Sequence, residues 1–443
     1  MLTEKRCREL TQHVVLLSKA DGVQVSLAAD EIVHQRFARN VPSSAGWVRD
    51  DSISIRSTFG TQSATASGNQ LDSHSLEALV RRSESLARQA PEDPEFLAAL
   101  GPQSYASVSV GTAESGAGRL EYLNRGVEHA LGRARRSGLV AAGFAEAREM
   151  VRSIGNSAGL FGYHRQGDAH FSETVRTPDG RGSGWASTAA GLAGELDFEG
   201  PTESAIHKAR RSAGARTLAA GDYPAVLEPA CVASLMGFLV EGMDMRRADE
   251  GRNFFSLAGD ETRLGERLFP VGINLVSDPG DGTVSSVPWA EDGTPHRRTH
   301  WIRDGVVENL HCDRYWARER SRRLQPFPPN TLMGGGEDSL EQLIEGTERG
   351  VLVTNLWYIR SVDPKTMLCT GLTRDGVFWI ENGRVTHPVN NFRWNDSPVH
   401  VLQEAEALSK PVRVGGRNGR SIHAFVPAIR VASFGFSSVS EAV

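Results

Sequence analysis

Long hydrophobic runs are absent from this sequence. No stretch of 18 or more apolar residues occurs among its 443 residues, and a helix that spans a bilayer needs about that length. The first residues, MLTEKRCRELTQH, form a polar amphipathic pattern without the apolar core of a secretion signal. We therefore expect a cytoplasmic protein that is neither secreted nor inserted into a membrane.

Cysteine is also scarce. The four cysteines, Cys7, Cys231, Cys312 and Cys369, lie far apart and form no C-x-x-C pair. Disulfide-rich secreted domains and paired-cysteine zinc sites need more numerous or more closely spaced cysteines. The pattern therefore indicates free thiols in a reducing compartment.

The sequence has no excess of positive charge. It contains 49 Lys and Arg residues against 54 Asp and Glu residues, which gives a formal net charge of −5. Proteins that bind nucleic acid through electrostatics usually carry a basic excess. The basic clusters at 207–216 and 317–324 contain no interleaved aromatic side chains for stacking on bases, so we interpret them as solvated helix faces. We expect no nucleic-acid partner.

The composition that is present describes an ordinary globular protein of two domains. Hydrophobic residues make up 39% of the chain and charged residues 23%, and the length is large for a single core. Residues 1–195 are predicted to form an α+β domain in which helices cover one face of a largely antiparallel sheet. Residues 196–220 are predicted as a linker helix, and residues 221–443 as a β-rich, barrel-like domain with a central helix.

Hydrophobic periodicity and turn signals place the individual elements. Helices are predicted at 2–20, 74–90, 119–137, 339–347 and 397–408. Strands are predicted at 23–27, 31–40, 52–60, 139–156, 160–164, 170–176, 184–187, 270–276, 299–307, 350–359, 376–382 and 426–436. The sequence Glu381-Asn382-Gly383-Arg384 is typical of a hairpin turn between two of these strands.

The clearest pattern lies between Gly221 and Glu250. A short apolar run at 223–227 predicts a buried strand, and Glu228-Pro229 predicts a helix start, since proline fits the first helical turn. Apolar residues then recur with helical spacing on a single face. These residues are Val232, Leu235, Met236, Leu239, Val240 and Met243. The stretch is therefore predicted to be a buried strand followed by a core helix.

This stretch also carries a likeness to a known family. The block GDYPAVLEPACVASLMGFLVEGM at 221–243 resembles the centre of the TldD/PmbA family of metallopeptidases, also called modulators of DNA gyrase. Further blocks with the same likeness follow in order at 292–318, 337–357, 371–392 and 425–437. The first half of the chain resembles the family more diffusely. The resemblance extends over nearly the whole chain.

The resemblance distinguishes two branches. In the TldD branch this helix carries His-Glu-x-x-x-His, and a cysteine near the C-terminus completes a zinc site in which the glutamate is the general base. When the motif is aligned on residues 240–242, its two histidines fall on Ala233 and Phe238 and its glutamate falls on Ser234. No cysteine follows Asn390. The chain therefore resembles the TldE/PmbA branch. The resemblance implies no catalytic, metal-binding or cofactor-binding residue in this chain, and it implies zinc in a partner subunit.

Two histidine-containing segments are alternative candidates for a metal site. His296 and His300 are four residues apart, a spacing that suits zinc on a helix. Their segment is predicted as a strand, where four residues span roughly 13 Å and two rings cannot share an ion. His311 and Cys312 are adjacent in another extended segment, so their side chains should point to opposite faces. We expect no metal at either place.

Three further features allow other chemistry. Cys231 and Cys369 are candidate nucleophiles, and Cys231 lies at a predicted helix N-terminus, where the helix dipole lowers a thiol pKa. We favour the interpretation that both are small buried hydrophobic residues. The run at 334–336 is three glycines without the Lys-Ser/Thr of a phosphate-binding loop, so it is interpreted as an ordinary loop. Asp292-Gly293 and Asp304-Gly305 are interpreted as turns and not as catalytic carboxylates.

Three functions remain open on the sequence. The resemblance implies a non-catalytic TldE-like subunit that forms a heterodimer with a TldD-like zinc peptidase and helps to enclose unfolded or precursor peptides. The second hypothesis is a stand-alone peptidase or amide hydrolase with a divergent site. The third is a peptide-binding module. A homodimer is an alternative assembly for each of them.

Overall fold

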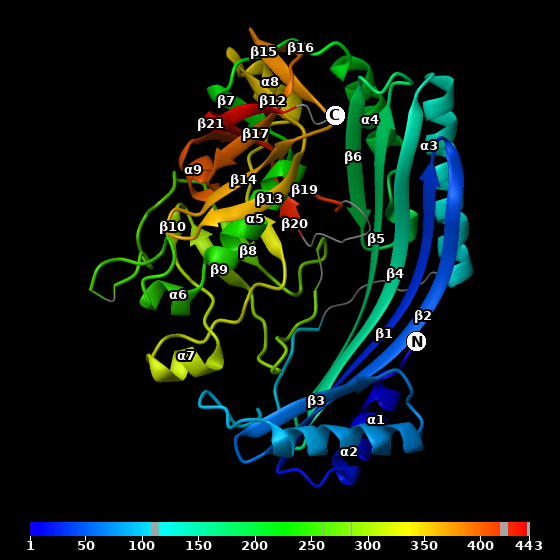
Figure 1. Ribbon diagram of the computed structural model, residues 1–443, viewed down its shortest axis with the longest axis vertical. Helices are drawn as coiled ribbons and strands as arrows, with labels where there is room; N and C mark the ends of the chain where they lie inside the picture. Colours follow the sequence, from blue (N-terminus) through cyan, green and yellow to red (C-terminus); the bar gives the residue numbers. More distant parts are fainter. Residues whose placement is uncertain (108–114, 260, 285, 417–423, 441–443) are drawn as a thin grey trace.

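The chain consists of two parts that lie side by side (Figure 1). The computed structural model describes residues 1–443 except 108–114, 260, 285, 417–423 and 441–443. We call residues 1–212 the N-terminal half and residues 213–443 the C-terminal half. A tall curved sheet of the N-terminal half runs the full length of the molecule, and the C-terminal half packs beside its upper part. No helix in the described ranges is long and apolar enough to cross a membrane.

The sheet of the N-terminal half has six strands, all antiparallel, in the order β3-β2-β1-β4-β5-β6. The strands are β1 (Gly22–Ala38), β2 (Val41–Phe59), β3 (Gln62–Gly68), β4 (Val140–Asn156), β5 (Phe161–Arg176) and β6 (Ser183–Ala190). Four of them, β1, β2, β4 and β5, have 16 to 19 residues, whereas the usual strand has about five or six. This confirms the predicted antiparallel sheet.

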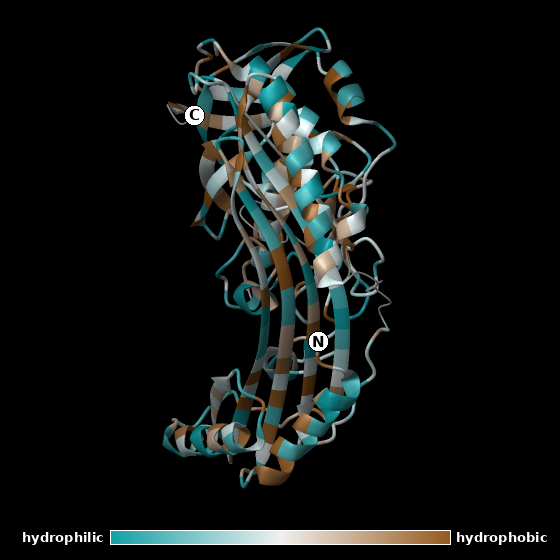
Figure 2. Ribbon diagram, turned by 90° about the vertical axis from the view of Figure 1, so that its right-hand side faces the viewer, coloured by the Kyte–Doolittle hydropathy of each residue, from teal (hydrophilic) through white to brown (hydrophobic). Residues whose placement is uncertain are grey.

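All helices of this half cover the same face of the sheet (Figure 2). The helices are α1 (Glu4–Leu17), α2 (Ser73–Gln89), α3 (Gly116–Arg136) and α4 (Glu199–Ser212), and a short 3-10 helix η1 (Ala193–Glu195) precedes α4. Alternate residues of β1 supply the apolar contacts, because side chains on a strand alternate between faces. Val25 and Leu27 pack in the core beneath α1 and α2, and Val33 and Phe37 in the core beneath α3 and α4.

Charged residues occupy the gap between these two cores. Arg119 at the start of α3 pairs with Glu31 of β1, and also with Glu149 of β4 at 3.1 Å. Arg165 of β5 pairs with the same Glu149. The sequence pattern predicts two short strands in place of each of β1 and β5, and this prediction is wrong. The polar residues that interrupt the apolar alternation are satisfied by partners from distant segments, so the strands continue through them.

The C-terminal half contains two sheets, of six and nine strands. The six-stranded sheet has the order β10-β9-β8-β11-β20-β19, from β8 (Leu275–Ser277), β9 (Thr299–Arg303), β10 (Val306–Val307), β11 (Thr331–Met333), β19 (Val412–Arg413) and β20 (Ala424–Val426). The nine-stranded sheet has the order β13-β14-β17-β21-β7-β12-β15-β16, with β18 paired to β21. Its strands are β7 (Gly221–Leu227), β12 (Arg349–Val353), β13 (Leu356–Asp363), β14 (Leu368–Thr373), β15 (Val377–Glu381), β16 (Arg384–Pro388), β17 (Asn391–Asp396), β18 (Ala405–Leu408) and β21 (Ile429–Ser440).

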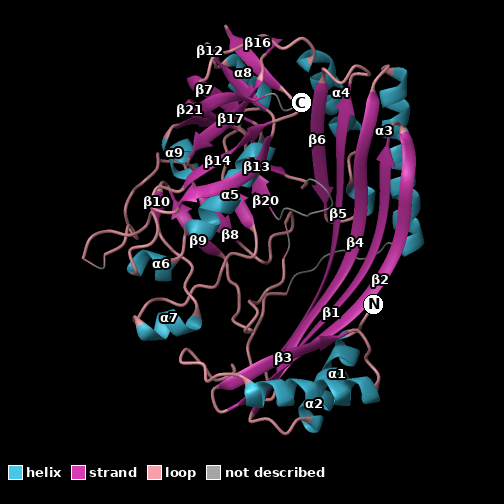
Figure 3. Ribbon diagram, in the orientation of Figure 1, coloured by secondary structure: helices cyan, strands magenta, loops and turns pink. Residues whose placement is uncertain are grey.

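The helix α5 (Pro229–Gly242) packs against strands of both sheets. The remaining helices are α6 (Met245–Asp249), α7 (Arg314–Glu319), α8 (Leu340–Glu345) and α9 (Pro398–Gln403). The predicted α+β class with a central helix in a β-rich C-terminal half is confirmed (Figure 3). In the part of the chain that the structure describes, the two sheets do not close into a barrel.

Three predicted elements of this half divide in the structure. Residues 350–359 form two strands, β12 and β13. Between them the Thr354 hydroxyl donates a hydrogen bond to the Gly376 carbonyl oxygen at 2.9 Å, and the chain passes from β12 inside the sheet to β13 at its edge. Residues 397–408 form α9 and then β18, which pairs with β21. Residues 299–307 form the hairpin β9–β10, with Asp304 and Gly305 at φ of 46° and 81°. The hairpin predicted at 381–384 is confirmed between β15 and β16.

Candidate functional site

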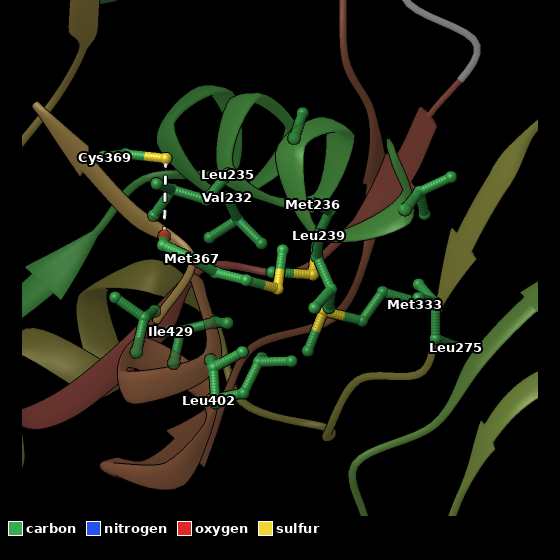
Figure 4. Close-up of a cluster of buried hydrophobic side chains, with 14 of the residues drawn as sticks. Val232, Leu235, Met236, Leu239, Leu275, Met333, Met367, Cys369, Leu402 and Ile429 are labelled. Carbon is green, nitrogen blue, oxygen red and sulfur yellow. Dashed lines mark hydrogen bonds between the residues drawn. The ribbon is translucent and has the colours of Figure 1, made fainter. Parts of the chain in front are cut away.

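Helix α5 begins where its sequence predicts. Strand β7 runs parallel to β12 and leads into Glu228, the N-cap residue, and Pro229, the first helical residue. The six residues of the predicted apolar stripe are all buried. Figure 4 shows the side chains of Met236 and Leu239 pointing from α5 toward Met333 and Met367, which come from β11 and the turn before β14. The helix is therefore the centre of the hydrophobic core of the C-terminal half.

The three motif positions on α5 carry no groups that suit a zinc ion. Ala233 is 4% exposed and contributes a methyl group to the core. The Ser234 hydroxyl donates a hydrogen bond to the Ala230 carbonyl oxygen at 2.9 Å, a bond within the helix. Phe238 packs against the same core as Ala233. Throughout the described residues, no group of three His, Cys, Asp or Glu side chains is arranged to hold a metal ion.

The structure does not bring the other histidine candidates together. His296 lies in a loop before β9, so the prediction that the strand includes it is wrong, whereas His300 lies within β9. Burial lowers the pKa of His296 to about 4 and also lowers the pKa of His300. His311 packs edge-on against Phe327 at a ring distance of 5.2 Å. Each of these rings is therefore held in its own packing environment.

All four cysteines are buried free thiols. Cys231 donates a weak hydrogen bond to the Val353 carbonyl oxygen at 3.4 Å, and burial raises its pKa well above the ordinary value. Burial also raises the pKa of Cys369 to about 11 and that of Cys312 to about 12. The expectation that the helix N-terminus lowers the Cys231 pKa is wrong, because burial dominates. The interpretation as small buried hydrophobic residues fits these surroundings.

Two of the three N–H groups of the glycine run donate hydrogen bonds within the protein. The Gly334 N–H donates to the Asn274 carbonyl oxygen at 2.9 Å, and the Gly336 N–H donates to the Ser409 carbonyl oxygen at 3.1 Å. A side chain at Gly335 would meet the same Ser409 oxygen at 2.3 Å. These glycines thus permit a close approach of two backbone segments. Asp292 accepts a hydrogen bond from the Thr294 N–H at 2.9 Å, as expected for a turn.

A buried ion pair at the start of α5 joins the two halves. Lys208 of α4 contacts Glu228 with an Nζ–Oε2 distance of 2.7 Å, and the side chains are 12% and 13% exposed. Interpreting Lys208 as part of a solvated helix face was therefore wrong. The sequence does contain a signal that Lys208 is partly buried, because it lies beside Ala209 and about one helical turn after Ala205, and both alanines are buried on α4. The sequence alone does not identify Glu228 as the partner of Lys208, because Glu228 lies on another element.

Two cavities share this ion pair. The larger, of about 430 Å³, lies between α4 and α8, and the smaller, of about 240 Å³, lies between β6, α4 and the start of α5. A separate groove of about 1,090 Å³ lies between the lower end of the tall sheet and loops of the C-terminal half. Its lining includes Arg56 from β2, Asp93 and Glu95 from the loop after α2, and Asp292 and Asp313.

The basic cluster at 317–324 is also engaged within the protein. Arg322 pairs with the buried Asp249 of α6 at 2.5 Å. The Trp316 indole N–H donates to the same carboxylate at 2.8 Å. This cluster therefore helps to fix α7 against α6.

Comparison with known proteins gives matches at two levels. Residues 220–438 match the family model described as the PmbA/TldA metallopeptidase C-terminal domain. No curated protein sequence matches the chain.

Three solved structures share the fold over nearly the whole chain. TldE from Thermococcus kodakarensis superposes with a TM-score of 0.85 and 18% identity, over 97% of this chain and 99% of that one. A proposed modulator of DNA gyrase from Thermotoga maritima superposes with a TM-score of 0.80 and 17% identity, over 97% of this chain and 99% of that one. Another proposed modulator of DNA gyrase, from Bacteroides thetaiotaomicron, superposes with a TM-score of 0.83 and 17% identity, over 99% of this chain and 100% of that one.

Proposed function

Because this chain belongs to the TldD/PmbA family, we propose that it is a TldE-type, non-catalytic subunit that pairs with a TldD-type zinc peptidase chain. The observation that carries this proposal is the state of α5. The helix and its surrounding core are intact, yet Ala233, Ser234 and Phe238 stand where zinc ligands and a general base would be needed. A catalytic zinc site requires three protein ligands and a carboxylate that activates water.

No substitute site is offered by the neighbouring residues. The Cys231 and Cys369 thiols have raised pKa values because they are buried, and a thiol of that kind is a poor nucleophile near neutral pH. His296 lies in the loop before β9 and His300 within β9, and neither belongs to a group of three possible metal ligands among the described residues. These surroundings support a chain that shapes a shared peptide-binding cavity in the cytoplasm while the partner performs hydrolysis.

Zinc content and complex formation test the proposal. The chain, tagged and purified from its native host, should copurify with a TldD-type protein that contains His-Glu-x-x-x-His. Plasma emission should find no stoichiometric zinc in the isolated chain and one zinc per pair in the complex. Stoichiometric zinc in the isolated, folded chain would overturn the assignment. A replacement of His300 by Ala is the matched control and should leave the zinc content of the complex unchanged.

A peptide-binding module is the second candidate, and the large groove favours it. Its volume of about 1,090 Å³ is slightly above the ordinary range for ligand sites. Polar strand residues line it together with acidic side chains such as Glu95 and Glu291. Binding of unfolded peptides to the chain without a partner, measured by fluorescence anisotropy, would support this function. A complete requirement for the partner would favour the subunit function instead.

A further inference from the structure

The cavity between α4 and α8 has the size and floor of a small-ligand site. Its volume is about 430 Å³, and ligand pockets typically measure about 300–1,000 Å³. Leu352 of β12, Phe378 of β15 and Ile344 of α8 line it, and all three belong to one apolar cluster. Part of a ligand that lies on this floor should therefore be apolar.

The two walls of the cavity carry opposite charges. Helix α4 contributes Lys208 and Arg211, and α8 contributes Glu341 and Glu345. Among the described residues, no ion pair joins one wall to the other. Lys208 is paired with Glu228, and Arg211 donates to the Val385 carbonyl oxygen at 2.6 Å. Arg211 on one wall and Glu341 on the other thus keep charge available for a ligand.

Two carboxyl groups, those of Glu228 and Glu341, line the cavity close enough to influence each other. Burial raises the pKa of the Glu228 carboxyl, the Lys208 ammonium opposes this shift, and the nearby Glu341 carboxylate adds to it. The Lys208 ammonium group is paired with Glu228, and the remaining cations of the lining are Arg211 of α4 and Arg384 of β16. A second cationic group placed beside Glu341 would be stabilised by both carboxylates.

We propose that this cavity binds a small zwitterion with an apolar side chain. Its ammonium group pairs with Glu341, its carboxylate pairs with Arg211, and its side chain covers Leu352 and Phe378. A simple anion such as phosphate would be repelled by the two glutamates of α8, and a simple cation would be repelled by Arg211 and Lys208. A ligand with both charges satisfies both walls. The proposal does not depend on the subunit function, because it concerns this chain alone.

A free apolar amino acid and a short apolar peptide share this chemistry. The charged groups of an amino acid lie on one Cα atom, whereas the ends of an extended dipeptide are about 7 Å apart. Calorimetric titration of the full chain with L-leucine and with Leu-Leu distinguishes these two sources. Leucinamide, which lacks the carboxylate, and N-acetyl-leucine, which lacks the ammonium group, are the matched control ligands.

We expect saturable binding of leucine or Leu-Leu. The two control ligands should bind more weakly, by up to about fivefold each, as the loss of one solvent-exposed ion pair implies. Glu341→Gln should weaken the zwitterion and leave N-acetyl-leucine unaffected. Arg211→Gln should weaken the zwitterion and leave leucinamide unaffected. Glu348→Gln and Arg210→Gln change charges that do not line the cavity, and they should have no effect.

Thermal unfolding of each variant verifies that it is folded. The proposal is overturned if neither leucine nor Leu-Leu binds to the folded chain. It is also overturned if the amide and acetyl ligands bind as tightly as the zwitterion, or if the two control variants weaken binding as much as Glu341→Gln and Arg211→Gln. Failure to bind would leave the copurification and zinc results unaffected, so the two proposals are tested separately.

Discussion

At the scale of single residues, burial outweighs other influences on ionisation. Cys231 lies at the N-terminus of α5, where the helix dipole should lower a thiol pKa, yet burial raises that pKa. Burial also raises the pKa of Cys7 to about 11 and that of Cys312 to about 12. The dipole of a helix acts over one turn and is moderate in size, whereas removing a thiolate from water is costly.

We expect the thiols to be unreactive in the folded chain. A soluble aromatic disulfide reagent at mildly alkaline pH should label none of the four cysteines in the native protein and all four in denaturant, as followed by the absorbance of the released thiolate. The physical reason is that both access and thiolate fraction are low. Rapid labelling of Cys231 in the native chain would contradict this prediction.

A second residue-scale prediction concerns Glu173 on β5. Its carboxyl is fully buried and accepts a hydrogen bond from the Thr202 hydroxyl at 2.8 Å. Burial raises its pKa from 4.5 to about 7. The folded chain therefore holds a proton that the unfolded chain releases, and stability should fall as pH rises from about 4.5 to about 7 and then level off.

Glu173→Gln should remove this pH dependence. The full shift corresponds to roughly 3–4 kcal/mol. The free energy of unfolding of the wild type relative to the variant should therefore decrease by roughly 2–3 kcal/mol between about pH 5 and about pH 8, because part of the effect lies below pH 5. Urea unfolding of both proteins at the two pH values measures it. Parallel pH profiles for the two proteins would show that Glu173 does not titrate as described.

At the scale of elements, α5 is a core helix whose position is determined by packing on both sides. Its stripe contacts strands of the six-stranded and the nine-stranded sheets. Leu239 is 0% exposed, so Leu239→Ala should cost roughly 2–5 kcal/mol through lost burial and the cavity left behind. Chemical denaturation provides the measurement. Ser234→Ala, which removes only a bond within the helix, is the control and should change stability by less than about 0.5 kcal/mol.

A midpoint of unfolding that is unchanged by Leu239→Ala would show that α5 is not buried as described. A large loss for Ser234→Ala would instead indicate that its hydroxyl has a role beyond the bond to Ala230.

Elements with a complete local signal could be predicted from sequence, and elements that depend on distant partners could not. The start of α5 is encoded by Glu228 and Pro229 themselves, and the turn at 381–384 by its Asn-Gly pair. Strand β1 was divided because Asp30 and Glu31 interrupt its alternation, and their partners Arg152 and Arg119 are far away in sequence. The same limit applies to the Lys208–Glu228 pair. The motif positions on α5 were identified from the family resemblance and not from periodicity.

At the scale of the whole molecule, polar contacts join the two halves at several levels. Lys208 and Glu228 meet at 2.7 Å, and Arg413 pairs with Asp168 of β5 at 2.6 Å. Nearer the lower end, Arg246 of α6 makes two hydrogen bonds to Glu95, at 2.6 and 2.9 Å. These contacts should hold the halves together even when the chain between them is cut.

Limited proteolysis tests the predicted division of the chain near 196–220. Helix α4 packs on the N-terminal sheet through Ala205, Ile206 and Ala209, whereas most of the connection at 213–220 is exposed. We expect the first cut in that connection, and we expect the two fragments to elute together in gel filtration. A protease-resistant product that spans 196–220 without a cut would contradict the division. Separation of the fragments would show that the contacts between the halves are weak.

Peptide cleavage tests the central claim most directly. An unfolded peptide should be incubated with this chain, with a TldD-type partner and with both, and the products identified by mass spectrometry. We predict no cleavage by this chain alone and cleavage by the pair. Replacing the motif glutamate of the partner should abolish that cleavage, whereas Cys231→Ala and His300→Ala in this chain should preserve it. Cleavage by this chain alone that resists chelators and is lost in Cys231→Ala would contradict the account and identify a thiol hydrolase.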